Sequence, residues 1–139
     1  MWRNLFLKSK SFKKDLKKRG CQGENDACVF LKGKGYKIIE RNFRNSKGYS
    51  LGEIDIIACK DNYLVFFEVK AGFGLKKDNL PPEMNITKDK LRKLHRIISC
   101  YLKEHPQWNR TPFSLDAIII TYDENENLKN IRHLEHIFL

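Results

Sequence analysis

Apolar residues recur at two different spacings along this chain, and the spacings predict its helices and strands. Helical spacing marks residues 22–34, where Ala27, Cys28 and Leu31 form one stripe, and residues 87–105. Strand-like apolar runs occupy residues 36–44, 51–60, 63–71, 113–122 and 128–138. Short turns join the first three runs, so they should form an antiparallel meander. The order α-β-β-β-α-β-β predicts an α/β (α+β) domain whose mixed sheet lies between helices.

Residues that cap or end helices support the predicted helix boundaries. Gly33 and Gly35 end the first helix, Thr87 can cap the second, and Pro106 ends it. Between the third strand and the second helix, residues 72–85 combine Gly, Lys, Asp and a Pro-Pro pair. This segment follows a charged strand end, so we expect a loop that faces the substrate.

Polar residues interrupt the two apolar runs between residues 51 and 70. Burying a carboxylate in a sheet costs several kcal/mol unless a cation compensates it. Strand alternation places Leu51, Glu53, Asp55 and Ile57 on one face and Ile54 and Ile56 on the other. In the next strand, Phe66, Glu68 and Lys70 share a face opposite Val65, Phe67 and Val69.

A tight antiparallel hairpin brings Asp55 near Glu68 and Lys70. Two converging carboxylates stay ionised only when cations lie between them, and Mg²⁺ (or Mn²⁺) suits their oxygens. Lys70 could orient a water or stabilise charge on a phosphate. These groups together predict a phosphodiesterase site. The alternative is an ordinary Glu-x-Lys strand face, usually a surface ion pair worth under ~1 kcal/mol.

The charge of the chain indicates its partners. The 139 residues carry a formal net charge of +10, which favours a polyanion or an anionic membrane. Residues 1–19 hold eight basic residues and one acid. They form either a flexible arm along a phosphate backbone, a basic amphipathic helix, or a frayed terminus. We therefore divide the chain into this arm and one domain over residues 20–139.

Several other classes of function are disfavoured. No apolar stretch approaches the ~20 residues that span a bilayer, and the amino-terminal order of apolar and basic residues is not that of a secretory signal. The four cysteines lack zinc-ligand spacing, so a reduced, cytoplasmic protein is expected. His133 and His136 should face opposite sides of a strand, which argues against a metal site there. Asp116 is expected to be a structural hydrogen-bond acceptor.

These motifs, taken in order, resemble a known group of nucleases. An acid on a helix, an acid on one strand and Glu-x-Lys on the next are similar to the PD-(D/E)xK, or restriction-endonuclease-like, superfamily. More closely, the chain resembles the YraN-like family of small bacterial proteins from about residue 20 to its end. The likeness is carried by Gly23-Glu24, Gly35-Tyr36, Arg41-Asn42, Gly52-Glu53-Ile54-Asp55, Phe67-Glu68-Val69-Lys70, Lys90 and Asp116.

The resemblance implies a magnesium-dependent nuclease fold akin to Holliday-junction resolvases. It implies that Asp55, Glu68 and Glu24 bind the metal, that Lys70 is the catalytic lysine, and that Lys90 points at the site. Glu53 either shares that site or only pairs with an arginine. Two family features are absent: an arginine where this chain has Gly72, and Arg-Phe-Asp where it has Ser114-Leu115-Asp116.

Three functions are therefore weighed. The first is a metal-dependent endonuclease acting on DNA, including branched or structured DNA, either as a monomer or as a homodimer. The second is a nucleic-acid-binding protein of the same fold with little or no activity, consistent with the missing arginines. The third is an adaptor whose basic arm docks on a membrane or ribosome.

Overall fold

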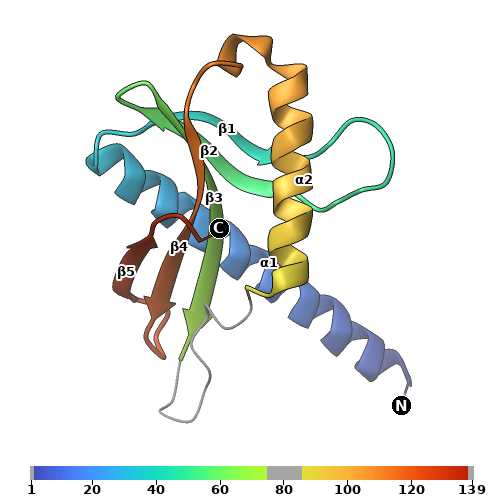
Figure 1. Cartoon of the computed structure of the whole chain (residues 1–139). Helices are drawn as coiled ribbons and strands as arrows, with labels where there is room; N and C mark the ends of the chain where they lie inside the picture. Colours follow the sequence, from blue (N-terminus) through green and yellow to red (C-terminus); the bar gives the residue numbers. More distant parts are fainter. Residues whose placement is uncertain (1, 75–85, 138–139) are drawn as a thin grey trace.

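A five-stranded mixed sheet with a helix on each face forms the domain (Figure 1). The computed structural model describes residues 2–74 and 86–137, with side chains from residue 13 onward. Its elements are α1 (Trp2–Gly33), β1 (Lys37–Phe43), β2 (Ile54–Lys60), β3 (Tyr63–Phe73), α2 (Lys88–Glu104), the 3₁₀ turn η2 (Pro106–Trp108), β4 (Phe113–Tyr122) and β5 (Leu128–Leu134). The predicted order α-β-β-β-α-β-β is confirmed.

The sheet follows the order of the chain, β1-β2-β3-β4-β5. Neighbouring strands are antiparallel except β3 and β4, which pair in parallel over ten residues. A parallel pair needs a crossover connection, and α2 lies within it. The predicted meander of β1, β2 and β3 is confirmed, and the topology is consistent with a restriction-endonuclease-like fold.

Two apolar layers hold the helices to the sheet. On one face, Ala27 and Leu31 of α1 pack with Phe67 of β3. On the other face, Leu94 and Ile98 of α2 pack with Phe66 of β3. The central strand β3 is thus covered on both faces, which explains its nearly unbroken apolar run.

The first helix is much longer than its apolar stripe predicts. It begins at Trp2 instead of near Gln22, so the prediction of a helix confined to residues 22–34 is wrong. Of the three forms considered for the basic arm, the helical one is observed, and Figure 1 shows it projecting past the sheet. Trp2, Leu5, Phe6, Phe12 and Leu16 recur at helical spacing, and lysine and leucine favour helix. Gly20 and Gly23 each cost only ~1 kcal/mol there, so the helix continues to the amino end of the described residues.

The strand boundaries differ from prediction by more than one residue at three ends. β2 begins at Ile54 instead of Leu51, β3 continues to Phe73, and β5 ends at Leu134. Residues 75–85, most of the predicted substrate-facing loop, lie outside the described residues, so that expectation stays a prediction.

The predicted pairing of Ile54 and Ile56 on one face is also wrong. Ile54 packs in the layer of α2, whereas Ile56 packs in the layer of α1. The opposite strand holds the reason: Asn42, between the partners of these two isoleucines, has φ +53°. A residue in this left-handed region interrupts the regular alternation of a strand.

All four cysteines are free. Among the described residues, no helix combines the length and apolarity needed to cross a bilayer.

Candidate metal and phosphodiester site

The acids that the sequence singled out meet in one cavity of about 470 Å³. It opens where the start of β2 and the second half of β3 pass between the two helices. Asp55 and Glu68 form its floor, both buried. Its other charged lining residues are Arg19, Glu24, Glu53, Lys70 and Lys90.

Asp55 is held by the backbone of the neighbouring strand. Its Oδ2 accepts a hydrogen bond of 2.7 Å from the amide of Val69. Burial, followed by the negative charge of Glu68, raises the pKa of Asp55 to about 8 despite that hydrogen bond. Among the described residues, no lysine or arginine forms an ion pair with Asp55. The site thus has a carboxyl group that lacks a cation.

Glu68 has two unlike oxygens. Its Oε1 lies 3.2 Å from Nζ of Lys70 and 3.4 Å from Nζ of Lys90. Its Oε2 is buried and has no hydrogen-bond partner in the described structure. Lys90 reaches this place because α2 starts nearby, where Thr87 Oγ1 caps the helix by accepting from the Lys90 amide at 3.2 Å. An unpaired buried carboxylate oxygen costs free energy unless another ligand satisfies it.

Two further acids approach from α1 and from the segment before β2. Nδ2 of Asn42 donates to Glu24 at 3.0 Å and to Glu53 at 3.4 Å. Arg41 lies 3.5 Å from Glu24, and Arg44 forms an ion pair of 3.1 Å with Glu53. One carboxylate oxygen each from Glu24, Glu53 and Asp55 lie within 4.8 Å of one another, a spacing that a single metal ion can bridge.

A glycine sets the distance between Glu24 and the strands. A Cβ placed on Gly23 would lie 3.0 Å from Cβ of Ala71 on β3, closer than ordinary packing allows. The bare backbone at Gly23 therefore lets α1 approach the sheet and brings the next side chain, Glu24, over the cavity.

All five residues proposed from the sequence, Glu24, Asp55, Glu68, Lys70 and Lys90, line this cavity. The predicted metal ligands are Asp55, Glu68 and Glu24, whereas the closest trio of carboxylates contains Glu53 in place of Glu68. Glu53 forms an ion pair with Arg44 and also lines the cavity.

Sequence reasoning did not assign a role to Asn42, which joins Glu24 to Glu53. A signal was present in the Arg41-Asn42 pair, since asparagine tolerates the left-handed backbone better than most residues.

Asp116 lies outside this cavity. It is buried and contacts residues near the carboxyl end of the chain. Its Oδ2 is 2.6 Å from Nε2 of His133, and its Oδ1 accepts from the amide of His136 at 3.1 Å. Burial alone would raise the pKa of Asp116, but the hydrogen bonds from His133 and His136 outweigh burial and lower it below its ordinary value. The prediction of a structural acceptor is confirmed.

Comparison with known proteins places these residues in a family. The sequence profile described as "Uncharacterised protein family UPF0102" matches residues 23–120, most of the chain. The chain belongs to the UPF0102 family. This membership agrees with the YraN-like resemblance. The UPF0102 match starts at Gly23, so it includes all five proposed site residues and leaves the basic part of α1 outside.

Bacterial relatives cover the same region. A UPF0102 protein of Helicobacter hepaticus is 43% identical over 113 residues, which cover 81% of this chain and 93% of the relative. One from a Sulfurovum species is 43% identical over 112 residues, covering 81% and 91%. A Helicobacter pylori relative is 39% identical over 115 residues, covering 83% and 91%.

Proposed function

We propose that this protein is a metal-dependent endonuclease that hydrolyses phosphodiester bonds in DNA, including branched or structured DNA. One observation carries the proposal. Asp55 has no described cationic partner, and the buried Oε2 of Glu68 has no hydrogen-bond partner, in one cavity of a strongly basic domain. Among the described residues, Asp55 lacks a compensating cation and Glu68 Oε2 lacks a donor, and a metal ion would satisfy both groups.

The donor set fits a hard divalent cation. Carboxylate oxygens are the ligands that Mg²⁺ and Mn²⁺ prefer, and three of them already lie within 4.8 Å of one another. Asp55, Glu68 and Glu24 would hold the ion, with Glu53 beside them. Such an ion, when bound, supplies the Lewis acid for phosphodiester hydrolysis.

The lysines of the chain complete the proposed chemistry. Lys70 and Lys90 are about a quarter and a third exposed, respectively, so their ammonium groups can reach both Glu68 and a phosphate in the cavity. Lys70 would orient a water or stabilise the charge that develops on the phosphoryl oxygens. Lys90 would pair with Glu68 and add a second positive group.

A second candidate function has its own support. Gly72 provides no guanidinium, and Asp116 is committed to His133 instead of the cavity. A nucleic-acid-binding protein with little or no activity would have these properties. Such a protein would gain no thermal stability from Mg²⁺, and its affinity would still fall steeply with salt.

Cleavage of DNA tests the first candidate. Linear, nicked and four-way DNA are incubated with the protein and Mg²⁺ or Mn²⁺. Wild type should cut at least one substrate, and Lys70→Ala should cut it at least about 10²-fold more slowly. Lys32→Ala, an exposed lysine at the far end of α1, is the matched control and should retain the rate.

Two results would count against the assignment. If wild type and a Glu68→Ala, Lys70→Ala double variant cut equally, the catalytic roles are wrong. If no substrate is cut while salt-sensitive binding persists, the second candidate replaces the first.

A further inference from the structure

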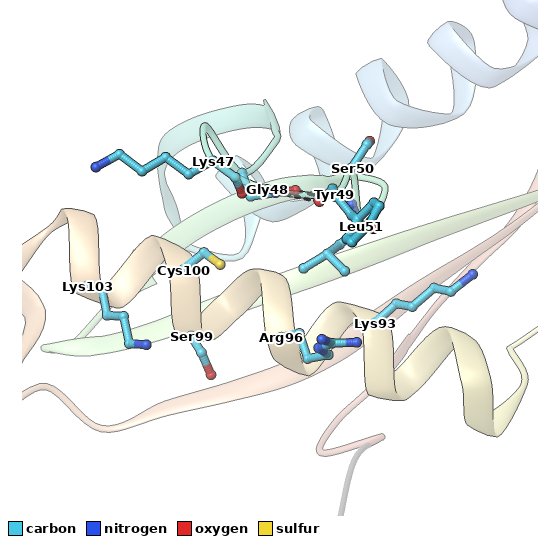
Figure 2. Close-up of a pocket in the computed structure, with 11 residues that line it drawn as sticks. Lys47, Gly48, Tyr49, Ser50, Leu51, Lys93, Arg96, Ser99, Cys100 and Lys103 are labelled. Carbon is cyan, nitrogen blue, oxygen red and sulfur yellow. Dashed lines mark hydrogen bonds between the residues drawn. The ribbon is translucent and has the colours of Figure 1, made fainter.

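A second cavity, of about 670 Å³, lies between α2 and the loop that joins β1 to β2 (Figure 2). Figure 2 shows side chains of α2 along one wall and the backbone of residues 47–51 along the other, with Leu51 between them. We call this cavity the loop groove. Its basic lining residues are Lys47, Lys93, Arg96 and Lys103.

The positive charge of the loop groove is not neutralised by described acids. Among the described residues, no carboxylate lies within ion-pairing distance of its four basic side chains. One acid is nearby, Glu104, and its Oε1 accepts a hydrogen bond of 2.6 Å from the Ser46 hydroxyl. A groove with this charge favours an anionic occupant.

The wall formed by the loop is internally ordered. The side-chain amide of Asn45 donates to the carbonyls of Lys47 and Tyr49, both at 2.8 Å, and its Oδ1 accepts from the Leu51 amide at 3.2 Å. Ser46 ties the loop to α2 through Glu104. These contacts leave Tyr49 on the surface, with 91% of it exposed. An exposed aromatic ring beside a basic groove is a platform on which a base can stack.

Both walls of the loop groove lead to the acid cavity. On α2, Lys93 of the groove is three residues, one helical turn, from Lys90 of the cavity. On the other wall, Leu51 of the groove is two residues from Glu53 of the cavity. A polynucleotide that enters the cavity therefore has a basic path leading away from it.

We propose that the loop groove binds a single-stranded segment of DNA next to the bond that is cut, with Tyr49 stacked on an unpaired base. This inference rests on the proposed function and narrows its substrate to DNA with a single-stranded tail, flap or splayed arm. A base inside a duplex is covered on both faces by its neighbours, so away from duplex ends Tyr49 can stack only on an unpaired base. From Lys93 to Lys103, α2 spans about 15 Å, long enough to follow a short segment of a single strand.

Binding without cleavage tests the inference. Fluorescence anisotropy of the full chain, in EDTA, would compare a short oligo(dT), a duplex of equal length, and that duplex with a single-stranded tail. Tyr49→Ala should weaken binding of the oligo(dT) and of the tailed duplex about tenfold and leave the blunt duplex within about twofold. Tyr49→Phe keeps the ring and should bind like wild type.

Charge removal gives a second measurement. Lys93→Ala with Arg96→Ala should make the log–log salt dependence of single-strand binding shallower by about 1.4, for two lost phosphate contacts. The control, Lys32→Ala with Lys37→Ala, removes the same charge from two exposed positions that do not line the loop groove. It should leave the salt dependence of binding unchanged. Circular dichroism would confirm that every variant is folded.

The outcomes separate this inference from the proposed function. If Tyr49→Ala binds all three DNAs like wild type, or loses blunt and tailed duplex equally, the loop groove assignment is wrong, whether or not the protein cuts DNA. If Tyr49→Ala selectively loses single strands while wild type cuts nothing, the groove assignment stands and only the proposed nuclease activity is wrong.

Discussion

Asp55 places an ionisable carboxyl group in a cavity that it shares with three other acids. Lysines or arginines offset Glu24, Glu53 and Glu68, whereas the partner of Asp55 among the described residues is a backbone amide. The metal-free site is therefore electrostatically strained, which is a common property of functional sites. Stability measurements can detect that strain without any assay of activity.

Asp55→Asn should stabilise the metal-free protein. The pKa of Asp55 is raised to about 8, so the folded state loses stability as the pH rises from about 4, where the unfolded chain ionises, through about 8. The amide keeps an acceptor for Val69 and removes the charge. In EDTA at pH 8, thermal melts should show a Tm several degrees higher for the variant and a flatter pH dependence.

Mg²⁺ provides the control for this prediction. It should raise the Tm of wild type at pH 8 and have a much smaller effect on Asp55→Asn. A variant less stable than wild type at pH 8 in EDTA would contradict the account of Asp55.

Asp116→Asn should have the opposite effect. The pKa of Asp116 is lowered, so its contribution to stability is present above its unfolded pKa of about 3.9 and is lost as the pH falls through the folded value. The variant should lose about 1–3 kcal/mol at pH 7, and its difference from wild type should shrink below about pH 4. Urea unfolding at several pH values measures both, with Asp61→Asn, an exposed turn residue, as the control. A difference that stays constant down to pH 2 would be inconsistent with this reading.

At the residue scale, strand alternation was sufficient to predict most of the cavity. Glu68 and Lys70 share a face of β3, and the residues before and between them along the strand follow the predicted alternation. Asn42 could not be predicted in the same way, because its role depends on a left-handed backbone and on contacts with acids 11 and 18 residues away. The opposite faces of Ile54 and Ile56 follow from the same irregularity.

At the scale of elements, the packing of α1 against β3 determines where Glu24 lies. The contact is close at Gly23 and open at Gly20, although both glycines belong to the same helix. This pair allows the effect of packing to be separated from the effect of helix propensity, since both positions gain the same side chain on substitution.

Gly23→Val should destabilise the protein by more than about 2 kcal/mol, because the new side chain meets Ala71 across the closely packed helix and strand. Gly20→Val has nothing within 4 Å and should change stability by less than about 1 kcal/mol. Chemical denaturation of the two variants measures the difference. Equal losses in both would mean that the close approach of α1 is not required.

Element boundaries were predictable where the chain carries a chemical stop signal. Thr87 and Pro106 fix α2 to within a residue of the predicted range, and β4 matches it fully. The amino-terminal half of α1 has no such signal. Its apolar residues Trp2, Leu5, Phe6, Phe12 and Leu16 recur at helical spacing, so periodicity could have predicted the helix, but the density of basic residues left an arm or a frayed terminus equally open.

At the scale of the whole molecule, positive charge and core are separated along α1. The buried core begins at Ala27, whereas the charge-rich segment is the first 19 residues. Arg19 marks the junction: it forms an ion pair with Glu126 and lies over the ring of Phe73.

Deletion of residues 1–15 should leave the Tm within about 2 °C and weaken binding of duplex DNA. The deletion removes five basic residues and one acid and spares Arg19 with its contacts. The salt dependence of binding should become shallower, because fewer counterions are released. Thermal melts and anisotropy titrations on the same preparation test both parts. A large fall in Tm would show that the arm supports the core.

The unbroken course of α1 also has a mechanical consequence. Trp2 and Glu24 belong to one helix and are about 33 Å apart at 1.5 Å per residue. Gly23, held against β3, lies one residue from the acid and far from the free end. A bend of about 10° where the helix leaves the sheet would therefore move its amino end by about 6 Å and the backbone of Glu24 by less than about 1 Å. The amino end of α1 can thus change direction while the carboxylate at its root keeps its position.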